Sequence, residues 1–376
     1  MVIPLSEPML NGNESNYLVE CVSSGFVSSV GPFVTTFEQK FASFVGASGA
    51  VAVSSGTAAL HVALLVAGVG RGDEVWVSDL TFIGSVNPVL YCGATPVLVD
   101  ADRSSWNVEP MQLLMALNER LAHGRPLPKA LVITHMLGVP ADLAGVAEFC
   151  RANGILLIED AAESVGAYWQ LGETDTLHTG LLGDIGCFSF NGNKIITTGG
   201  GGMIVARNEK HLELARHLST QAKIPHSDYM HDVVGYNYRM TNTAAAIGLA
   251  QLEQLPVFLA KRKEVRMSYE KNLESVSFQA CPPLAVANNW LTTVRFDSAE
   301  VRDGAREALR ANRIDSRPVW TPMRLQRPLK GCDVIGSDNA VEVFATALSL
   351  PSSATLQEHM IQEISEIVNS VVRAGV

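Results

Sequence analysis

A single lysine lies between two apolar runs in the stretch Asp184-Ile-Gly-Cys-Phe-Ser-Phe-Asn-Gly-Asn-Lys194-Ile-Ile-Thr-Thr-Gly-Gly-Gly-Gly-Met203. The runs Ile185–Phe190 and Gly202–Ala206 have the composition of buried strands. The residues from Asn191 to Gly200 are too few for a helical crossover between parallel strands. We therefore expect the two strands to pair antiparallel or to meet across a loop, and this loop carries Lys194.

Further strand-like runs precede this stretch, and helical patterns lie between them. Such alternation predicts βαβ units and a largely parallel sheet, whose strands are buried on both faces. The expected strands are Val51–Ser54, Glu74–Ser78, Thr95–Asp100, Ala130–His135 and Ile155–Asp160, and the expected helices are Thr57–Val69, Gly84–Cys92, Glu109–Ala122 and Leu143–Asn153. The sequence thus predicts an α/β fold with a mostly parallel, mixed seven-stranded sheet flanked by helices.

The pattern changes near Leu252, where a second, smaller α/β domain is expected. We predict a large domain over residues 1–251, including an N-terminal arm, and a small C-terminal domain over residues 252–376. The elements expected in the second domain are a long helix Pro256–Leu273, a strand Trp290–Phe296, and helices Ala299–Asn312, Ala340–Ala347 and Thr355–Ala374.

The composition limits the class of protein. With 47% hydrophobic and 18% charged residues in 376, the chain is expected to form a compact globular protein. The net charge of −10 argues against non-specific nucleic-acid binding, which needs clustered cations. Six scattered cysteines without a C-x-x-C pair favour free thiols in a reducing compartment. No signal-peptide pattern and no apolar run of about 20 residues is present, so we expect a cytoplasmic protein without a membrane span. The histidine spacing predicts no metal site.

Two polar features follow strand ends. Ser54-Ser-Gly56-Thr57 opens a helix, with Thr57 as the expected cap, and free amides at a helix N-terminus bind phosphate. An ordinary capped helix is the alternative. Asp160 ends a strand at the edge where open α/β sheets bind ligands. Its carboxylate could hydrogen-bond a protonated ring nitrogen or cap the residues that follow.

Lys194 lies among small and aromatic residues and precedes glycines that allow close backbone approach. A desolvated lysine amine loses its proton readily and becomes a nucleophile, although a solvated loop lysine is the ordinary alternative. Phe82 and His135 also follow or end strands; Phe82 could stack on a planar cofactor, and His135 could reach the same site, or both could be core residues. A Schiff-base lysine, a carboxylate for a pyridinium and a phosphate-binding turn together predict pyridoxal 5′-phosphate (PLP).

These residues resemble those of the DegT/DnrJ/EryC1/StrS family of sugar-nucleotide aminotransferases, within the aspartate-aminotransferase-like fold. The motifs that carry the resemblance are Ser55–Leu60, Glu159-Asp-Ala-Ala-Glu163, Cys187–Lys194 and Gly235-Tyr-Asn-Tyr-Arg-Met240. The resemblance implies that Lys194 forms the internal aldimine with PLP and later carries a proton at C4′. It also implies that Asp160 pairs with the pyridine nitrogen.

The same resemblance implies further cofactor contacts and a homodimer with shared active sites. Gly56, Thr57 and Ser189 would bind the phosphate, and Phe82 would stack on the ring. Glu163 occupies a position, often Gln in the family, near the ring hydroxyl. Asn237 matches an asparagine that reaches the phosphate of the neighbouring subunit. The candidates for substrate contacts are His135, Arg239 and Arg317.

Within the family, the chain looks most similar to the LegC-type branch. The motifs that it shares with this branch are Leu5-Ser-Glu-Pro, Val27-Ser-Ser-Val-Gly31, Gln221-Ala-Lys-Ile-Pro-His226 and Asn288-Asn-Trp290. This branch implies transfer of an amino group from L-glutamate to C4 of a nucleotide-linked 4-keto-6-deoxy-N-acetylhexosamine, on the way to legionaminic acid and related surface sugars. One departure is His135-Met-Leu-Gly138, where many relatives carry an aromatic residue before the glycine.

Three alternatives remain open at this point. The enzyme could aminate a 3-keto nucleotide sugar, or it could act on amino acids alone. A PLP-binding regulator without enzymatic activity is the alternative outside enzymes. The dehydratase branch of the family replaces the lysine with histidine, so Lys194 argues against it.

Overall fold

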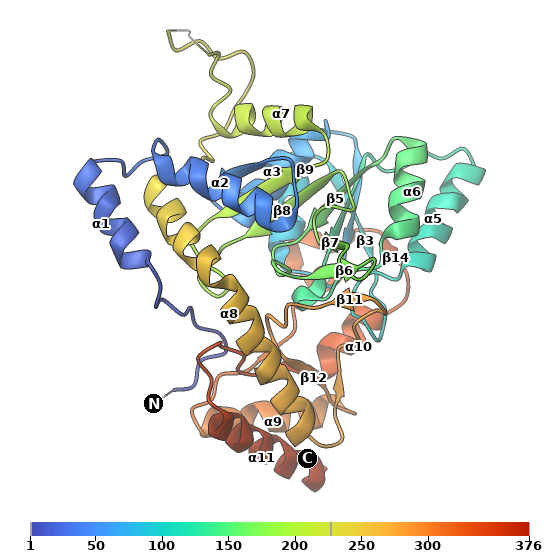
Figure 1. Ribbon diagram of the computed structural model, residues 1–376. Coiled ribbons are helices and arrows are strands. Elements are labelled where there is room, and N and C mark those ends of the chain that lie inside the picture. The colour runs from blue at the N-terminus through green and yellow to red at the C-terminus, as the bar shows by residue number, and fades with distance from the viewer. Residues whose placement is uncertain (1, 226–227, 376) are drawn as a thin grey trace.

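The computed structural model describes residues 2–225 and 228–375, and it has the predicted α/β architecture (Figure 1). His226, at the end of one branch motif, lies outside the described residues. The central sheet has the strand order β1-β9-β8-β5-β4-β2-β3-β14. Its strands are β1 (Ala50–Val53), β9 (Gly202–Ala206), β8 (Ile185–Ser189), β5 (Leu156–Asp160), β4 (Ala130–Thr134), β2 (Glu74–Ser78), β3 (Thr95–Val99) and β14 (Val334–Ile335).

Strand β9 runs antiparallel to both of its neighbours, β1 and β8, whereas the strands from β8 to β14 are parallel. Of the two arrangements expected for the strands that flank the Lys194 loop, the structure has the antiparallel pairing. The loop from Asn191 to Gly200 is too short to hold the helical crossover that parallel strands need, which agrees with the antiparallel pairing.

The prediction of seven strands was wrong, because an eighth is found among the described residues. Strand β14 lies in the C-terminal third of the chain and pairs parallel with β3 through Val334↔Leu98 and Ile335↔Val99. A strand of two residues has no periodicity that a sequence pattern could reveal. The pairing also means that the C-terminal region contributes directly to the central sheet.

Helices cover both faces of this sheet. On one face lie α3 (Gly56–Val66), α4 (Asn87–Tyr91) and α7 (Glu209–Ser219), and on the other lie α2 (Pro32–Val45), α5 (Pro110–Ala122), α6 (Ala144–Asn153) and α8 (Asn242–Asn272), with α1 (Glu14–Ser24) packed against α8. Helices α1, α2 and α7 were not predicted. In α2, Phe37 and Phe41 pack their rings 5.3 and 5.4 Å from that of Phe190, which follows β8. This packing holds the chain where the Lys194 loop begins.

Helix α8 begins earlier than predicted. Thr241 caps it by accepting a hydrogen bond from the amide of Ala244, and Pro256, expected near its start, lies inside it. Tertiary packing overrides the local cost of this proline, because Leu255 and Phe258 on either side are buried in the core. Among the described residues, α8 is the one helix long and apolar enough to cross a membrane by length and composition, a test that buried core helices also pass. The domain boundary at 251/252 falls within α8, and the two-domain division stays a prediction.

The C-terminal region forms its own antiparallel sheet. Its strand order is β10 (Ser277–Phe278), β12 (Thr293–Arg295), β15 (Ala347–Ser349) and β13 (Arg317–Pro318). The helices α9 (Ala299–Ala311), α10 (Asn339–Thr346) and α11 (Glu358–Ala374) agree with the predicted ones to within three residues at either end. A third sheet joins β11 (Ala285–Val286), β6 (Tyr168–Gln170) and β7 (Thr176–His178), and the short 3₁₀ helices are Ile83–Ser85, Met136–Gly138, Met323–Leu325 and Arg327–Leu329.

Candidate active site

A cavity of about 410 Å³ lies at the carboxyl edge of the central sheet. The last residues of β4, β5 and β8 line it, because the ends of parallel strands meet at one edge. The structure brings eight of the predicted site residues together at this cavity. They are Gly56, Thr57, Phe82, Asp160, Glu163, Ser189, Lys194 and Arg317.

The start of α3 forms an anion cradle at one end of the cavity. The predicted cap, Thr57, was wrong: the hydroxyl of Ser55 accepts the hydrogen bond from the amide of Ala58 at 3.0 Å. Ser55 accepts hydrogen bonds from the amides of Ala58 and Ala59. The amides of Gly56 and Thr57, at the first turn of the helix, have no hydrogen-bond partner within the described residues and are available to a ligand. A Cβ on Gly56 would lie 2.8 Å from the Cβ of Ser189, so only glycine lets that serine approach. These two free amides, together with the hydroxyls of Thr57 and Ser189, suit a phosphate.

Asp160 is held rigidly at the end of β5. Its side chain is buried, and its Oδ2 accepts a hydrogen bond from the hydroxyl of Ser85 at 2.5 Å, while Oδ1 accepts one from the amide of Ala162 at 3.1 Å. The alternative role as a cap applies only to the turn at Ala162, since no helix follows. Burial raises the pKa of Asp160, and the hydrogen bonds from Ser85 and Ala162 oppose that shift. A cationic partner in the cavity would favour the ionised carboxylate further.

Ser85 belongs to a hydroxyl network that sequence reasoning missed. Thr81 lies 2.6 Å from Ser85 and 2.8 Å from Thr134, measured between hydroxyl oxygens. All three side chains are buried and line the cavity. The network connects the ends of β2 and β4 to Asp160, which explains how one carboxylate keeps its orientation.

Lys194 points its amine toward Glu163. The distance from Nζ to Oε1 of Glu163 is 3.6 Å, and the lysine side chain is only 12% exposed. Burial lowers the pKa of Lys194, whereas the negative charges of Glu163 and Asp160 oppose that shift. The amine therefore has both a dry environment, which favours its neutral form, and an adjacent anion, which favours its protonated form.

Glu163 is itself fixed from two sides. Its Oε1 accepts a hydrogen bond from the indole of Trp320 at 2.9 Å, and its Oε2 accepts one from the amide of Leu137 at 2.7 Å. Burial raises the pKa of Glu163, and Lys194 opposes this shift. Trp320 also packs 5.1 Å from the ring of Phe82, so the two aromatic residues form one wall of the cavity. Trp320 lies far from the other site residues in the sequence and was not predicted.

The substitution Glu163→Gln is expected to move the titration of Lys194 to lower pH. It removes a negative charge that raises the pKa of the amine, while the burial that lowers this pKa remains. The pH dependence of Lys194 acylation by an amine-reactive reagent in the cofactor-free protein, followed by peptide mass spectrometry, measures the midpoint. Glu148→Gln, on an exposed position of α6, is the matched control and should leave the midpoint in place. An unchanged or higher midpoint in Glu163→Gln would contradict the assigned ion pair.

Two candidates for substrate contacts do not reach the cavity. His135 is buried behind it: Nε2 lies 2.8 Å from Glu159, and Nδ1 accepts a hydrogen bond from the amide of Ala141. Arg239 binds Oε1 of Glu38 at 2.5 Å and the carbonyl oxygen of Ala52 at 2.9 Å. The prediction that His135 and Arg239 contact the substrate in this cavity is corrected accordingly. Both side chains are bound to buried partners whose positions the sequence does not reveal.

Arg317 and Asn237 remain open to solvent. Arg317 lines the mouth of the cavity with a side chain that is 69% exposed, and its ion pair with Asp315 is long at 3.4 Å. Asn237 is exposed, pairs through its backbone with Thr220, and does not line the cavity of its own chain. Either side chain is therefore free to contact a group from outside the chain.

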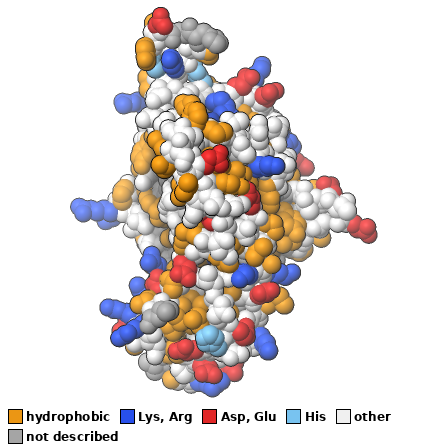
Figure 2. Space-filling model, turned by 60° about the vertical axis from the view of Figure 1, so that its left-hand side comes forward, with side chains coloured by type: hydrophobic (Ala, Val, Ile, Leu, Met, Phe, Trp, Pro, Cys, Tyr) orange, Lys and Arg blue, Asp and Glu red, His pale blue; other side chains and the backbone are white. Residues whose placement is uncertain are grey.

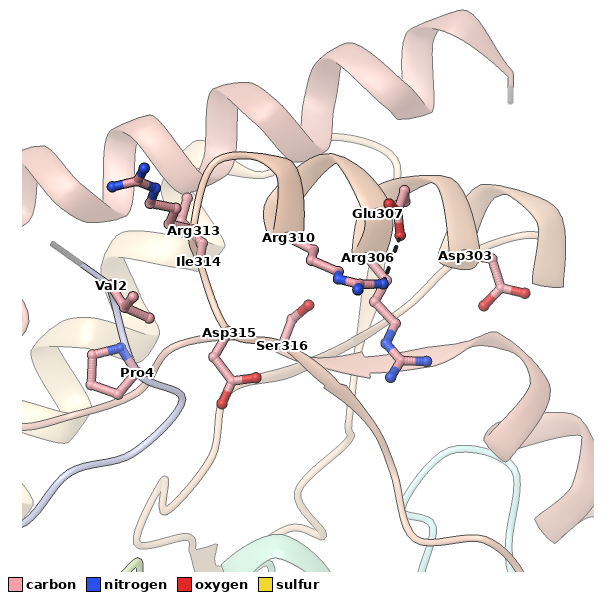
Figure 3. Close-up of a pocket in the computed structure, with 10 residues that line it drawn as sticks. All are labelled: Val2, Pro4, Asp303, Arg306, Glu307, Arg310, Arg313, Ile314, Asp315 and Ser316. Atoms are coloured by element: carbon pink, nitrogen blue, oxygen red, sulfur yellow. Dashed lines mark ion pairs between the residues drawn. The ribbon is translucent and has the colours of Figure 1, made fainter.

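A larger surface hollow of about 810 Å³ lies beside α9 and is lined by Asp315, the ion-pair partner of Arg317 (Figure 3). Its arginines, Arg306, Arg310 and Arg313, are balanced by three acidic residues, one of which, Glu307, pairs with Arg310 at 3.7 Å. Of these two hollows, we place the chemistry in the smaller cavity, because it is the one lined by the buried, mutually oriented groups Asp160, Glu163 and Lys194. Within the described residues, no group of three potential metal ligands is found.

Comparison with known proteins identifies the family that the chain resembles. The model of the DegT/DnrJ/EryC1/StrS aminotransferase family matches residues 8–369. The chain is 39% identical over 376 residues to GDP-perosamine synthase of Caulobacter vibrioides, covering 98% of each chain. It is 37% identical over 374 residues to EpsN of Bacillus subtilis, a predicted pyridoxal phosphate-dependent aminotransferase, covering 97% of this chain and 95% of EpsN. Among solved structures, the aminotransferase TlmJ from Streptoalloteichus hindustanus has a TM-score of 0.88 at 28% identity, covering 100% of this chain and 99% of TlmJ.

The fold and the cavity therefore define a PLP-dependent aminotransferase. The chain belongs to the DegT/DnrJ/EryC1/StrS aminotransferase family.

Proposed function

We propose that this enzyme transfers an amino group from L-glutamate to C4 of a nucleotide-linked 4-keto-6-deoxyhexose, with or without an N-acetyl group. The product would enter surface-polysaccharide or nonulosonic, legionaminic-type sugar biosynthesis, in the cytoplasm. Relatives named GDP-perosamine synthase, from Caulobacter vibrioides and Escherichia coli O157:H7, support a nucleotide-sugar substrate. The observation that carries the proposal is the meeting of Lys194, Asp160 and the anion cradle in one cavity.

The residues around the cavity fit PLP. The amides of Gly56 and Thr57 and the hydroxyl of Ser189 would hold its phosphate, which needs several donors close together. Asp160 would pair with the protonated ring nitrogen, since it is a buried carboxylate held by Ser85 and Ala162 that faces the cavity. Phe82 would pack against the ring. When bound, PLP supplies an electron sink for the negative charge that develops at the reacting carbon.

Glu163 and Lys194 would have different roles at the cofactor. Glu163 would lie near the ring hydroxyl, where its carboxylate can only accept hydrogen bonds unless it is protonated. Lys194 Nζ would attach the cofactor to the chain and, once free, would carry a proton from Cα of the donor to C4′ of the cofactor in one half-reaction and in the reverse direction in the other. Its opposing pKa influences suit an amine that must both accept and release a proton.

The substrate is tested by a screen with purified enzyme and L-glutamate, following release of 2-oxoglutarate. The acceptors are 4-keto-6-deoxyhexoses linked to UDP, GDP or dTDP, the corresponding 3-keto sugars, and ordinary 2-keto acids. We expect turnover with at least one 4-keto sugar nucleotide. Exclusive turnover of 3-keto sugars or of 2-keto acids would replace the proposal with one of these alternative substrates, and no turnover of any acceptor would favour a PLP-binding regulator.

We further propose that the enzyme is a homodimer with active sites shared between subunits. Hydrophobic side chains are exposed on the face that includes α1 (Figure 2). They are Val19, Val22, Phe26, Val27 and Val30, and more follow at Tyr229, Val233 and Val234, near Asn237 in the sequence. Large contiguous apolar patches are rare on monomeric proteins, and a second copy would cover these side chains. Asn237 would then reach the phosphate of the neighbouring subunit.

Hybrid dimers provide a test of the shared site. Lys194→Ala and Asn237→Ala homodimers are each expected to be impaired, but a hybrid has one site that retains both residues. Mixing the two variants through reversible denaturation should therefore recover up to about a quarter of wild-type activity if subunits pair at random and Asn237 acts across the interface. Mixing Lys194→Ala with itself is the control. No recovery above the summed homodimers would indicate that each site is built within one chain.

A further inference from the structure

Two distant segments of the chain meet at the backbone of Asn193, the residue before Lys194. The carbonyl oxygen of Asn193 accepts a hydrogen bond from the indole N–H of Trp290 at 2.7 Å and another from the hydroxyl of Ser6 at 3.1 Å. Ser6 comes from the N-terminal arm and Trp290 from the C-terminal region. Both donors therefore act on the peptide that carries the lysine, although neither lines the cavity.

The ring of Trp290 contacts the lysine as well. Nζ of Lys194 lies 3.9 Å from the centre of the indole, and the tryptophan is fully buried. A cation over the face of an aromatic ring is attracted by the ring quadrupole, and indole is the strongest such partner in proteins. One side chain thus fixes both ends of Lys194: the backbone through the indole N–H and the amine through the ring face.

Trp290 is itself held by a buried charge. Arg262 donates hydrogen bonds to the carbonyl oxygens of Trp290 at 2.5 Å and of Ser352 at 2.8 Å. It is 2% exposed and has no carboxylate partner within the described residues, and burial lowers its pKa to about 10. The side chain of Asn288 accepts a hydrogen bond from the amide of Trp290 at 2.9 Å. Burying a guanidinium without an anionic partner is unfavourable unless its N–H groups are hydrogen-bonded. Arg262 therefore depends on these carbonyl groups, and its bonds hold Trp290 in this position.

Asn288 extends the arrangement to the second partner of the lysine. Its side-chain amide donates to the carbonyl oxygens of Glu163 at 2.8 Å and of Val165 at 2.9 Å. The segment Asn288–Trp290 therefore contacts the backbone on both sides of the ion pair between Lys194 and Glu163. This segment therefore contributes to the relative position of the amine and the carboxylate, together with the bonds of Trp320 and Leu137 to the Glu163 carboxylate.

We propose that Trp290 is a positioning residue, which sets the location of Lys194 Nζ by anchoring the Asn193 carbonyl group and supporting the amine with its ring. The proposal rests on the role assigned to Lys194 under the proposed function. Trp290 acts through Lys194 and does not line the cavity. Ser6 is the second anchor of the same carbonyl group.

Trp290→Phe separates the two contacts, because phenylalanine keeps a ring face but removes the N–H donor. We expect kcat to fall about 5- to 50-fold with KM for glutamate unchanged within about twofold, since small misplacements of a reacting group reduce rate rather than binding. Trp76→Phe is the matched control. Trp76 is another buried tryptophan, whose indole N–H donates to Glu74 at 3.4 Å. It lies on a strand of the sheet and packs on the side of α5 and α6, so its substitution should leave kcat unchanged.

A second measurement uses the cofactor-free protein and does not depend on activity. Hydrogen–deuterium exchange of the peptide that contains residues 191–199 should accelerate about 2- to 10-fold in Trp290→Phe, the factor that corresponds to one lost hydrogen bond. Ser6→Ala alone should have a smaller effect on this peptide. The double variant should exceed the sum of the single effects, because the carbonyl oxygen then loses both donors.

The outcomes separate this proposal from the proposed function. Faster exchange confined to the loop, together with the kcat effect, supports the positioning role. Unchanged exchange of the loop, or equal acceleration throughout the protein, overturns it, even when Lys194→Ala is inactive. If Trp290→Phe does not fold, Ser6→Ala in the partly buried N-terminal arm decides: no loop effect in that variant overturns the double anchor. Full activity of Lys194→Ala would instead contradict the proposed function, whatever the exchange shows.

Discussion

The substitution Lys194→Ala is expected to lower transaminase turnover by at least about 10²- to 10⁴-fold, the usual contribution of a positioned acid–base group. The loss should be at the upper end of this range, because Lys194 is also the nucleophile proposed to hold the cofactor. The fold should survive, since the side-chain contacts of Lys194 are those with Glu163 and Trp290 in a loop. Removing the positive charge of Lys194 removes an influence that lowers the pKa of Glu163. This carboxylate can then take up a proton more readily, which limits the electrostatic cost of the substitution.

Three measurements check this result. Release of 2-oxoglutarate reports turnover, the visible absorbance of the lysine-bound cofactor reports the covalent linkage, and circular dichroism with Tm reports folding. Lys40→Ala, on an exposed position of α2, is the matched control and should match the wild-type protein in all three. A folded Lys194→Ala protein with ordinary transaminase rates would remove the basis of the proposed function.

Asp160→Asn is expected to keep part of the cofactor binding but to lower kcat by about 10²- to 10³-fold, the typical cost of removing one preorganised electrostatic partner. Asparagine has nearly the same shape, and its oxygen can still accept a hydrogen bond from Ser85 or Ala162. It cannot supply the negative charge that keeps a ring nitrogen protonated. The binding site should therefore persist while the electron sink weakens.

The readouts for this variant are the fraction of protein that retains PLP and the kcat for glutamate. The control is Asp184→Asn. Asp184 also accepts a hydrogen bond from a backbone amide, that of Leu157 at 2.9 Å, but it precedes β8 and so lies at the amino end of that strand, away from the cavity. Near-wild-type kcat in Asp160→Asn would mean that another group protonates the ring.

Asp160 illustrates what can be predicted from sequence. It ends a continuous apolar run, and parallel strands place their carboxyl ends at one edge. Gly56, Ser189 and Lys194 follow the same logic, and all of them line the cavity. His135 shows the limit: it also follows a parallel strand, yet its ring turns away from the cavity to Glu159 and Ala141. Position along a strand can be predicted, whereas the direction of one terminal side chain depends on buried partners.

The missed residues share a different property. Ser85, Trp320 and Trp290 act on the site from segments without regular strand or long-helix structure, and each acts through another residue rather than alone. Ser55 was missed because several adjacent residues were suitable caps, and only the backbone conformation selects among them. Strand β14 was missed because two residues carry no period.

The sequence by itself determined seven of the eight strands of the central sheet, the helices α3 to α6 between them, and the combination of residue types that predicts PLP. These depend on local periodicity, chain length and chemistry that each segment carries alone. The tertiary structure alone decided that Trp320 orients Glu163, that Ser6 and Trp290 anchor the peptide before Lys194, and that His135 and Arg239 lie outside the cavity. The physical reason is that hydrogen bonds between distant segments form only once packing brings them together, and no local pattern records their geometry.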